Sequence, residues 1–448
     1  MIAAPALIVP ALIFPALSAG VFAAAPVRTA ILAVYLGGLL LLPIADYGQP
    51  FAGTEFPFWI IGPALPSQGL VEKTWIAPLA ALILAALRDG RRLAAWRPGR
   101  ADLAMAAWCL WPLAAGLWAE APRPAAAVAA LQVAGCWGLP WVLGRVWFSR
   151  PEDRVLLLKG LALAGLACLP FAALEGLRGP FLHDLLYGPH PFRHDGEVRY
   201  LGYRPLGFFL NGNLYGIWVA AAATAAVWCA LALRGPWRAA AALALGVAVA
   251  AQSAGALLLM AAALGLMAVW GRPWVLPALA AAGGALALLL ALHLSGLVPV
   301  EHLARDTAPG QAALEAFRAL GRGSFPWRIS QDLKAMAALE GTPLLGASAW
   351  DWWRAAGTRP WGLMMLIVGQ YGLAAAALVF GGLGGAAAAA LMRLRRSAAW
   401  RPEAAALPLA AIVLMALGDA ILNAFFLFPA VLAAGAVAGR AQAPAGPA

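Results

Sequence analysis

Residues 203–216, YRPLGFFLNGNLYG, place an arginine and two asparagines at the edge of a long apolar segment. Pro205 favours extended backbone before it and a helix start after it, which would hold Arg204 at the mouth of the helix. We expect Asn211 and Asn213 about two turns into that helix. A guanidinium binds phosphate oxygens in a bidentate manner without a metal. The amides indicate either a polar cavity or a hydrogen bond to a neighbouring helix.

More arginines lie in two long connections, 176–206 and 298–360. We interpret Arg204 and Arg328 as the residues that bind a lipid-linked pyrophosphate and stabilise its charge as it leaves. The further substrate-binding candidates, beside Asn211 and Asn213, are Arg199, Arg322 and Arg359. Two alternatives stay open. Scattered arginines also contact anionic lipid headgroups, and this chain is crowded with Ala, Gly and Pro, which indicates a compositional bias.

Two carboxylates are candidate general bases: Asp351, inside WDWW, and Glu340, before GTPLLG. We expect most of the other outward-facing acids to pair with arginines; these are Glu175, Asp184, Asp195, Glu197, Glu301, Asp306, Glu315, Asp332 and Asp419. A loop histidine is an alternative base, or a metal ligand, among His183, His190 and His194. Their spacing matches no zinc signature, so we predict no metal site. No Walker A, GxSxG or Rossmann motif occurs, and we expect no cofactor.

The composition that must position these residues is that of a membrane protein. The 448 residues are 63% hydrophobic and 11% charged, with a mean hydropathy of +0.80. The net charge of +11 comes without a soluble basic domain or an aromatic-basic patch, so we expect no nucleic-acid partner. The four cysteines fall inside apolar runs, and we interpret them as packing residues.

Apolar runs long enough to cross a bilayer predict an all-α, polytopic protein with twelve or thirteen transmembrane helices. The expected spans are 3–23, 28–46, 74–88, 103–120, 124–148, 154–175, 207–233, 237–251, 254–270, 273–297, 361–392, 403–421 and 424–440. The apolar start of the chain lacks a basic n-region, so we expect it to be retained as a span.

Arginines occupy alternate short connections, which the positive-inside rule assigns to the cytoplasm. The other connections, including both long ones, then face outward. Tryptophans and a predicted helix at 327–340 indicate that the second is ordered. The chain divides into N-terminal helices (1–175), a first long outward-facing loop with central helices (176–297), a large outward-facing loop (298–360) and C-terminal helices (361–448).

Four segments carry a resemblance to one family. RPLGFFLNGN resembles Arg-x-x-Gly-x-Phe-x-Asn-Pro-Asn at a span start, with Gly212 in place of the proline, and QSAGA at 252–256 resembles Ser-Arg-Gly-Ala without its arginine. WRISQDLKAMAALEGTPLLG is similar to a loop helix that leads into Pro-Leu-Leu-Gly. WGLMMLIVGQYGLAAAAL is similar to the helix that closes the large loop. In order and spacing these segments resemble the O-antigen ligase and O-antigen polymerase superfamily over roughly residues 150–440.

The resemblance implies a GT-C-like fold in the bacterial inner membrane with a periplasmic active face. It implies a metal-independent glycosyltransferase whose partners are an undecaprenyl-pyrophosphate-linked glycan donor, a glycan acceptor and membrane lipids. Trp361 stands where the ligases have a histidine, so we favour a polysaccharide polymerase. The alternatives are an O-antigen ligase that transfers glycan to lipid A-core or protein, a transporter or flippase, and a non-catalytic scaffold.

Overall fold

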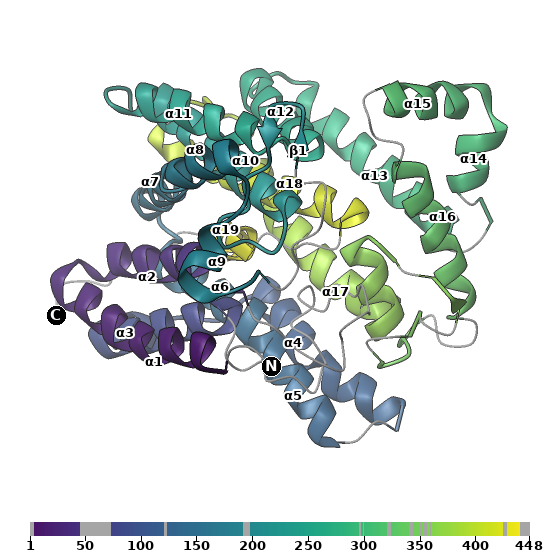
Figure 1. Cartoon of the computed structure of the whole chain (residues 1–448). Helices are drawn as coiled ribbons and strands as arrows, with labels where there is room; N and C mark the ends of the chain where they lie inside the picture. Colours follow the sequence, from purple (N-terminus) through teal and green to yellow (C-terminus); the bar gives the residue numbers. More distant parts are fainter. Residues whose placement is uncertain are drawn as a thin grey trace.

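The computed structural model describes residues 4–44, 73–120, 123–190, 198–294, 297–298, 300–319, 324–339, 344–349, 352–353, 356–358, 360–423 and 428–439. Within these residues the protein is a bundle of α-helices with one short antiparallel pair of strands (Figure 1). In the described residues each expected span overlaps a helix, which confirms the all-α prediction, but the span expected at 207–233 is helical only from Gly212.

The helices of the N-terminal part are α1 (Ala4–Ala24), α2 (Val27–Leu41), α3 (Lys73–Ala94), α4 (Arg100–Trp118), α5 (Arg123–Val133), α6 (Leu139–Trp147), α7 (Pro151–Leu166), α8 (Leu169–Arg178) and α9 (Leu182–Tyr187). A π-helical turn, Ala134–Gly138, joins α5 to α6.

The strands β1 (Val198–Arg199) and β2 (Gly202–Tyr203) follow, with Val198 opposite Tyr203. The remaining helices are α10 (Gly212–Ala232), α11 (Trp237–Ala250), α12 (Ala254–Val269), α13 (Val275–Leu294), α14 (Val300–Asp306), α15 (Ala308–Ala319), α16 (Ser324–Ala337), α17 (Leu363–Arg393), α18 (Ala406–Leu422) and α19 (Phe428–Ala438).

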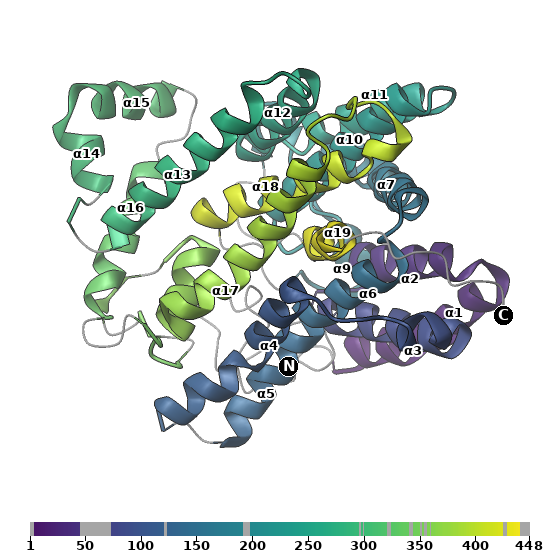
Figure 2. The same cartoon turned by 180° about the vertical axis from the view of Figure 1, so that it is seen from behind.

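Seven helical segments of the described chain are long and apolar enough to cross a membrane: Arg100–Trp118, Arg123–Trp147, Pro151–Arg178, Gly212–Ala232, Val275–Leu294, Leu363–Arg393 and Pro402–Leu422. Five shorter apolar helices accompany them, and the number of crossings stays a prediction. The helices α14, α15 and α16 project beyond one end of the bundle in both views (Figures 1 and 2). The second long connection is therefore ordered where the structure describes it, and its last helix begins at Ser324 rather than at 327.

The arginines of the short connections gather at one end of the bundle, called here the basic end. Arg28, at the start of α2, forms an ion pair with Asp153 at the start of α7. Arg145, near the end of α6, binds both carboxylate oxygens of Asp102 on α4, at 2.9 and 3.2 Å from Nε. Arg154 donates to the carbonyl of Ala436 at the end of α19. The arginine-rich connections that alternate along the sequence thus lie together at one end of the bundle.

The opposite end, called here the loop end, carries α9, the β1–β2 pair and the start of α10. Lys73 at the start of α3 donates to the carbonyl of Leu42 just after α2, 3.3 Å away. At the same end, the amide of Leu363 at the start of α17 donates to the carbonyl of Asn423 after α18, 3.0 Å away.

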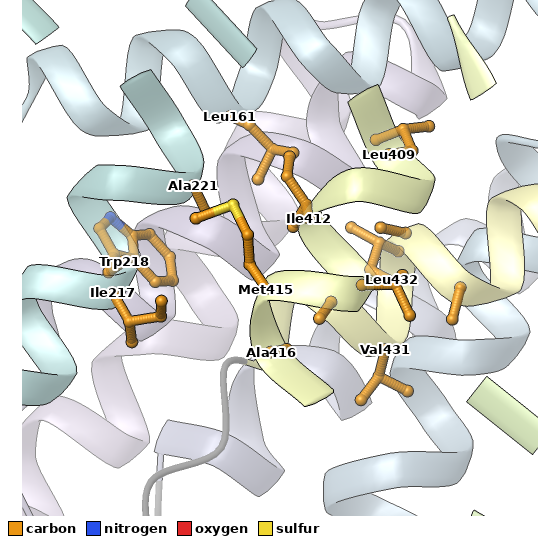
Figure 3. Close-up of a cluster of buried hydrophobic side chains, with 14 of the residues drawn as sticks. Leu161, Ile217, Trp218, Ala221, Leu409, Ile412, Met415, Ala416, Val431 and Leu432 are labelled. Atoms are coloured by element: carbon orange, nitrogen blue, oxygen red, sulfur yellow. The ribbon is translucent and has the colours of Figure 1, made fainter. Parts of the chain in front are cut away.

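The hydrophobic core lies where α7, α10, α18 and α19 meet (Figure 3). Trp218 of α10, Met415 of α18 and Leu432 of α19 are buried there. α10 is apolar on all sides because other helices surround it, which is the pattern of a central helix.

Two glycines set the close approach of α6 and α19. A Cβ added to Gly144 would lie 2.1 Å from the Leu432 carbonyl oxygen, and one added to Gly435 would lie 2.3 Å from the Trp141 carbonyl oxygen. The helix backbones touch at both places, so any side chain there would force the helices apart.

We expect Gly144→Ala to lower the apparent melting temperature of the detergent-solubilised protein, because overpacking costs about 1–3 kcal/mol. Gly283→Ala on α13 is the matched control, since no heavy atom lies within 4 Å of the Cβ it would add. Thermal unfolding followed by tryptophan fluorescence measures both. Equal melting temperatures for the two variants would contradict the close contact between α6 and α19.

Candidate functional site

The start of α10 is built differently from the prediction. Asn211 is the N-cap of the helix: its Oδ1 accepts hydrogen bonds from the backbone N–H groups of Asn213 at 2.9 Å and Leu214 at 3.0 Å. The expectation that the asparagines lie two turns inside a helix is therefore wrong. The helix begins at Gly212 because the asparagine side chain satisfies amides that have no partner within the helix.

Arg204 lies across this helix start and is 4% exposed. Its Nη2 donates to Oδ1 of Asn213 at 2.8 Å, and its Nε donates to the carbonyl of Ala251, at the end of α11, at 3.1 Å. A Cβ on Gly212 would lie 2.1 Å from Nε of Arg204. The glycine that replaces the proline of the resembling motif therefore leaves room for the guanidinium.

The turn between α11 and α12 meets the same segment. Gln252 accepts a hydrogen bond from the Leu201 backbone at 2.9 Å and donates to the Tyr203 carbonyl at 3.2 Å. A Cβ on Gly216 would lie 2.3 Å from Cβ of Ser253. Two segments that carry the resemblance, RPLGFFLNGN and QSAGA, thus pack together. Arg199, in the hairpin before them, is exposed.

Glu175 holds the loop that leads to α10, and it is completely buried (0% exposed). Its Oε2 accepts hydrogen bonds from the amides of Leu206 and Gly207, both at 2.7 Å, and its Oε1 accepts from Phe181 and Leu182. The expected pairing of Glu175 with an arginine is wrong, because four backbone amides solvate its carboxylate instead.

This carboxylate explains why residues 205–211 form a loop although they are largely apolar. The amides of Leu206 and Gly207 bond to a side chain and not to a helical carbonyl, and Gly207 adopts a left-handed φ of +55°. A buried carboxylate close to the end of an apolar segment is the sequence signal that points to such a role.

Lys73 and two histidines complete this side of the loop end. Lys73 donates to the Phe208 carbonyl, and its Nζ lies 5.4 Å from the centre of the Phe209 ring. The Nε2 of His190 lies 3.0 Å from the Phe209 carbonyl oxygen, and burial lowers the pKa of His190 to about 4. Burial also lowers the pKa of His183.

The two histidines therefore stabilise the loop through hydrogen bonds to backbone carbonyl groups. A neutral His190 that faces a carbonyl oxygen carries its proton on Nε2 and donates it there. His194 lies outside the described residues. Over the described part of the chain, no group of three or more His, Cys, Asp or Glu side chains is arranged to hold a metal ion.

Arg328, on α16, is the other arginine proposed to stabilise the leaving group. Its Nη1 donates to Oδ1 of Asn423 at 2.7 Å and to the carbonyl of Leu422 at 3.2 Å, at the end of α18. Its Cζ lies 5.2 Å from the ring centre of Trp361, a cation–π contact. Trp361, which stands where the sequence resemblance leads us to expect a histidine, thus packs its ring against the Arg328 guanidinium.

Two carboxylates lie beside this guanidinium. Asp419, 6% exposed, accepts a hydrogen bond from Nδ2 of Asn423 at 2.6 Å, which turns the amide oxygen of Asn423 toward Arg328. Oδ1 of Asp332, one turn after Arg328 on α16, accepts from the backbone amide of Trp361 at 3.4 Å. Burial raises the pKa of Asp332 to about 7, against the opposing effects of that amide and of Arg328.

The segment after α16 also packs on α17. The amide of Ala374 donates to the Leu344 carbonyl at 3.3 Å, and the amide of Ser348 donates to the Gln370 carbonyl at 2.8 Å. These bonds form where Gly372, with a φ of +84°, interrupts the helix. The PLLG segment and the WGLMMLIVGQYG segment are therefore in contact through their backbones.

Both arginines lie at the loop end. α12 begins beside Arg204, and α18 ends beside Arg328. The two helices are in contact near these ends, because a Cβ on Gly418 would lie 3.0 Å from Cδ2 of Leu259. The structure therefore places Arg204, Asn211, Asn213 and Arg328 at one end of the bundle. Four other candidates lie outside the described residues: Arg322, Glu340, Asp351 and Arg359.

Sequence reasoning did not assign a role to Asn423, and it counted Glu175, Asp332 and Asp419 only as ion-pair partners. The signal available for Asn423 is weak, since it is one polar residue between two apolar runs. Its partner Arg328 is 95 residues away in the chain.

The fold and the site are those of an α-helical protein with helices long and apolar enough to cross a membrane and with fixed guanidinium groups at one end. Comparison with known proteins adds no identity: no family model, no curated protein and no solved structure matches this chain.

We expect Glu175→Gln to destabilise the loop before α10, because an amide cannot accept hydrogen bonds at both ends of its side chain. Unsatisfied buried N–H groups cost about 1–3 kcal/mol. Hydrogen exchange of peptides that cover residues 204–211 should speed up, and the apparent melting temperature should fall. Glu315→Gln, at an exposed position on α15, is the control. Unchanged exchange in Glu175→Gln would contradict the role given to this carboxylate.

Proposed function

We propose that this protein is a membrane glycosyltransferase that uses a polyprenyl-pyrophosphate-linked glycan as donor and a second glycan as acceptor, and that it extends polysaccharide chains. The reaction would take place on the periplasmic side of the bacterial inner membrane. The observation that carries the proposal is the placement of Arg204 and Arg328 at the same end of the bundle, each oriented by an asparagine amide oxygen.

The chemistry of the leaving group supports this choice. When the sugar departs, negative charge grows on the pyrophosphate oxygens, and fixed guanidinium groups stabilise that charge most when they need not reorganise. The amide oxygens of Asn213 and Asn423 each accept one N–H of their arginine. These amide oxygens orient the two guanidinium groups, and the amides themselves carry no charge.

The position of the site also suits a lipid-linked substrate. The loop end lies at the ends of apolar helices, where the polyprenyl chain can stay in the membrane while its pyrophosphate meets the loops. Lys73, at the start of α3, is a further cation at this end. The four segments that resemble the O-antigen ligase and polymerase superfamily all contribute contacts at or near the loop end.

The competing functions predict different outcomes. A ligase would attach glycan to lipid A-core or to a protein, and its deletion would abolish attachment. Deletion of a polymerase would leave a single repeat attached. A transporter or flippase would move the lipid-linked glycan without forming a new glycosidic bond. Chain-length analysis of the surface polysaccharide after deletion separates the first two, and a transfer assay with purified protein separates both from the third.

We expect Arg204→Ala and Arg328→Ala each to lower the rate of glycan transfer from a purified lipid-pyrophosphate donor by about 10²-fold, the usual cost of removing one charge-stabilising donor. Arg318→Ala is the control, because Arg318 is exposed on α15. Size-exclusion profiles show whether each variant is folded. If both variants transfer as fast as the parent protein, the proposed site is wrong.

A further inference from the structure

Within the described residues, four buried or partly buried carboxylates lie at the loop end: Glu175, Asp184, Asp332 and Asp419. Asp184, on α9, accepts a hydrogen bond from the backbone amide of His190 at 2.9 Å. Glu175 accepts four backbone hydrogen bonds and has no exposed surface. Asp419 is 6% exposed and accepts a 2.6 Å hydrogen bond from Asn423. The hydrogen bonds of Glu175 hold loop amides in place, and that of Asp419 orients the Asn423 side chain. Neither can reach a substrate without breaking the contacts that position a loop or Arg328.

Asp332 is different. Its side chain is partly exposed, and in the described part of the chain its carboxylate accepts one long hydrogen bond, 3.4 Å from the Trp361 amide. It follows Arg328 by four residues on α16, so both side chains project from the same face of the helix. A group that binds Arg328 is therefore within reach of Asp332.

From this arrangement we infer that Asp332 is the general base that accepts the proton of the acceptor hydroxyl. The inference rests on the proposed glycosyl transfer and names a catalytic residue for it. Trp361, its neighbour, has no basic atom in its side chain.

The step balances without a metal or a redox partner. The acceptor's hydroxyl oxygen forms a bond to the anomeric carbon of the donor sugar. The bond from that carbon to the pyrophosphate oxygen breaks, and its electron pair leaves with the pyrophosphate, whose charge Arg328 stabilises. The hydroxyl proton passes to the Asp332 carboxylate. Asp332 would thus accept the proton, while Arg328, one turn earlier on the same helix, would stabilise the charge of the leaving group.

The charges around Asp332 favour such a role. Within the described residues, Arg328 on the same helix is the charged group that acts on Asp332, and the Trp361 contact that precedes α17 is uncharged. The carboxylate of Asp419, on α18, also interacts electrostatically with the Arg328 guanidinium. Burial dominates these effects and raises the pKa of Asp332 to about 7, where a general base works most efficiently near neutral pH.

The test compares the purified parent protein with Asp332→Asn, Asp332→Glu and the control Asp306→Asn, whose side chain is exposed on α14. Single-turnover transfer from a defined lipid-pyrophosphate-linked glycan is measured across the pH range around 7, and donor binding is measured separately. Asp351→Asn and Glu340→Gln are included because these residues are the other candidate bases.

The parent rate should rise with pH through about 7, because the base acts only when it is deprotonated. Asp332→Asn should bind the donor normally, lose about 10²–10⁴-fold in rate and lose this rise. Asp332→Glu should recover part of the rate, and Asp306→Asn should match the parent.

Several results would overturn the inference. One is an Asp332→Asn rate equal to the parent rate with the same dependence on pH; another is loss of that dependence in Asp351→Asn or Glu340→Gln instead. Loss of donor binding in Asp332→Asn without any recovery in Asp332→Glu would show a structural role. A parent protein that binds the donor but transfers nothing would overturn the proposed function as well, so the two failures are distinguishable.

Discussion

The arrangement of this protein depends on the cost of taking charged groups out of water. An ionised side chain inside an apolar bundle must be paired or hydrogen-bonded, because its desolvation costs several kcal/mol. Arg145 and Asp102 meet this requirement as an ion pair at the basic end. Glu175 meets it with four backbone amides at the loop end. The helices between the two ends can then be almost entirely apolar, as α10 is.

The same requirement is met in another way at the two candidate arginines. Asn213 and Asn423 offer uncharged amide oxygens, which orient the guanidinium groups of Arg204 and Arg328. The carboxylates of Asp332 and Asp419 also interact electrostatically with Arg328. Asn211 and Asp419 in turn support this arrangement, by starting α10 and by orienting Asn423. Guanidinium groups that are held in fixed orientations are suited to bind an anion, and on this basis we propose a pyrophosphate substrate.

Sequence reasoning predicted the helices well, because a run of apolar residues long enough to cross a membrane has few other stable conformations. It was wrong about Asn211, since Phe208 and Phe209 extend the apolar run although Glu175 holds that stretch as a loop. It could not find the contact between Arg328 and Asn423, because nothing local in the sequence joins residues 95 positions apart. Short segments determine local caps and spans, whereas tertiary packing sets the partners of buried charges.

We propose that Arg204 and Arg328 bind one pyrophosphate from two sides of the loop end. A structure of the protein in a lipid nanodisc with a lipid-pyrophosphate-linked glycan tests it most directly. We expect pyrophosphate oxygens within about 3 Å of both guanidinium groups, with the polyprenyl chain lying against apolar helix surfaces. A pyrophosphate bound at the basic end, or one that contacts neither Arg204 nor Arg328, would contradict it.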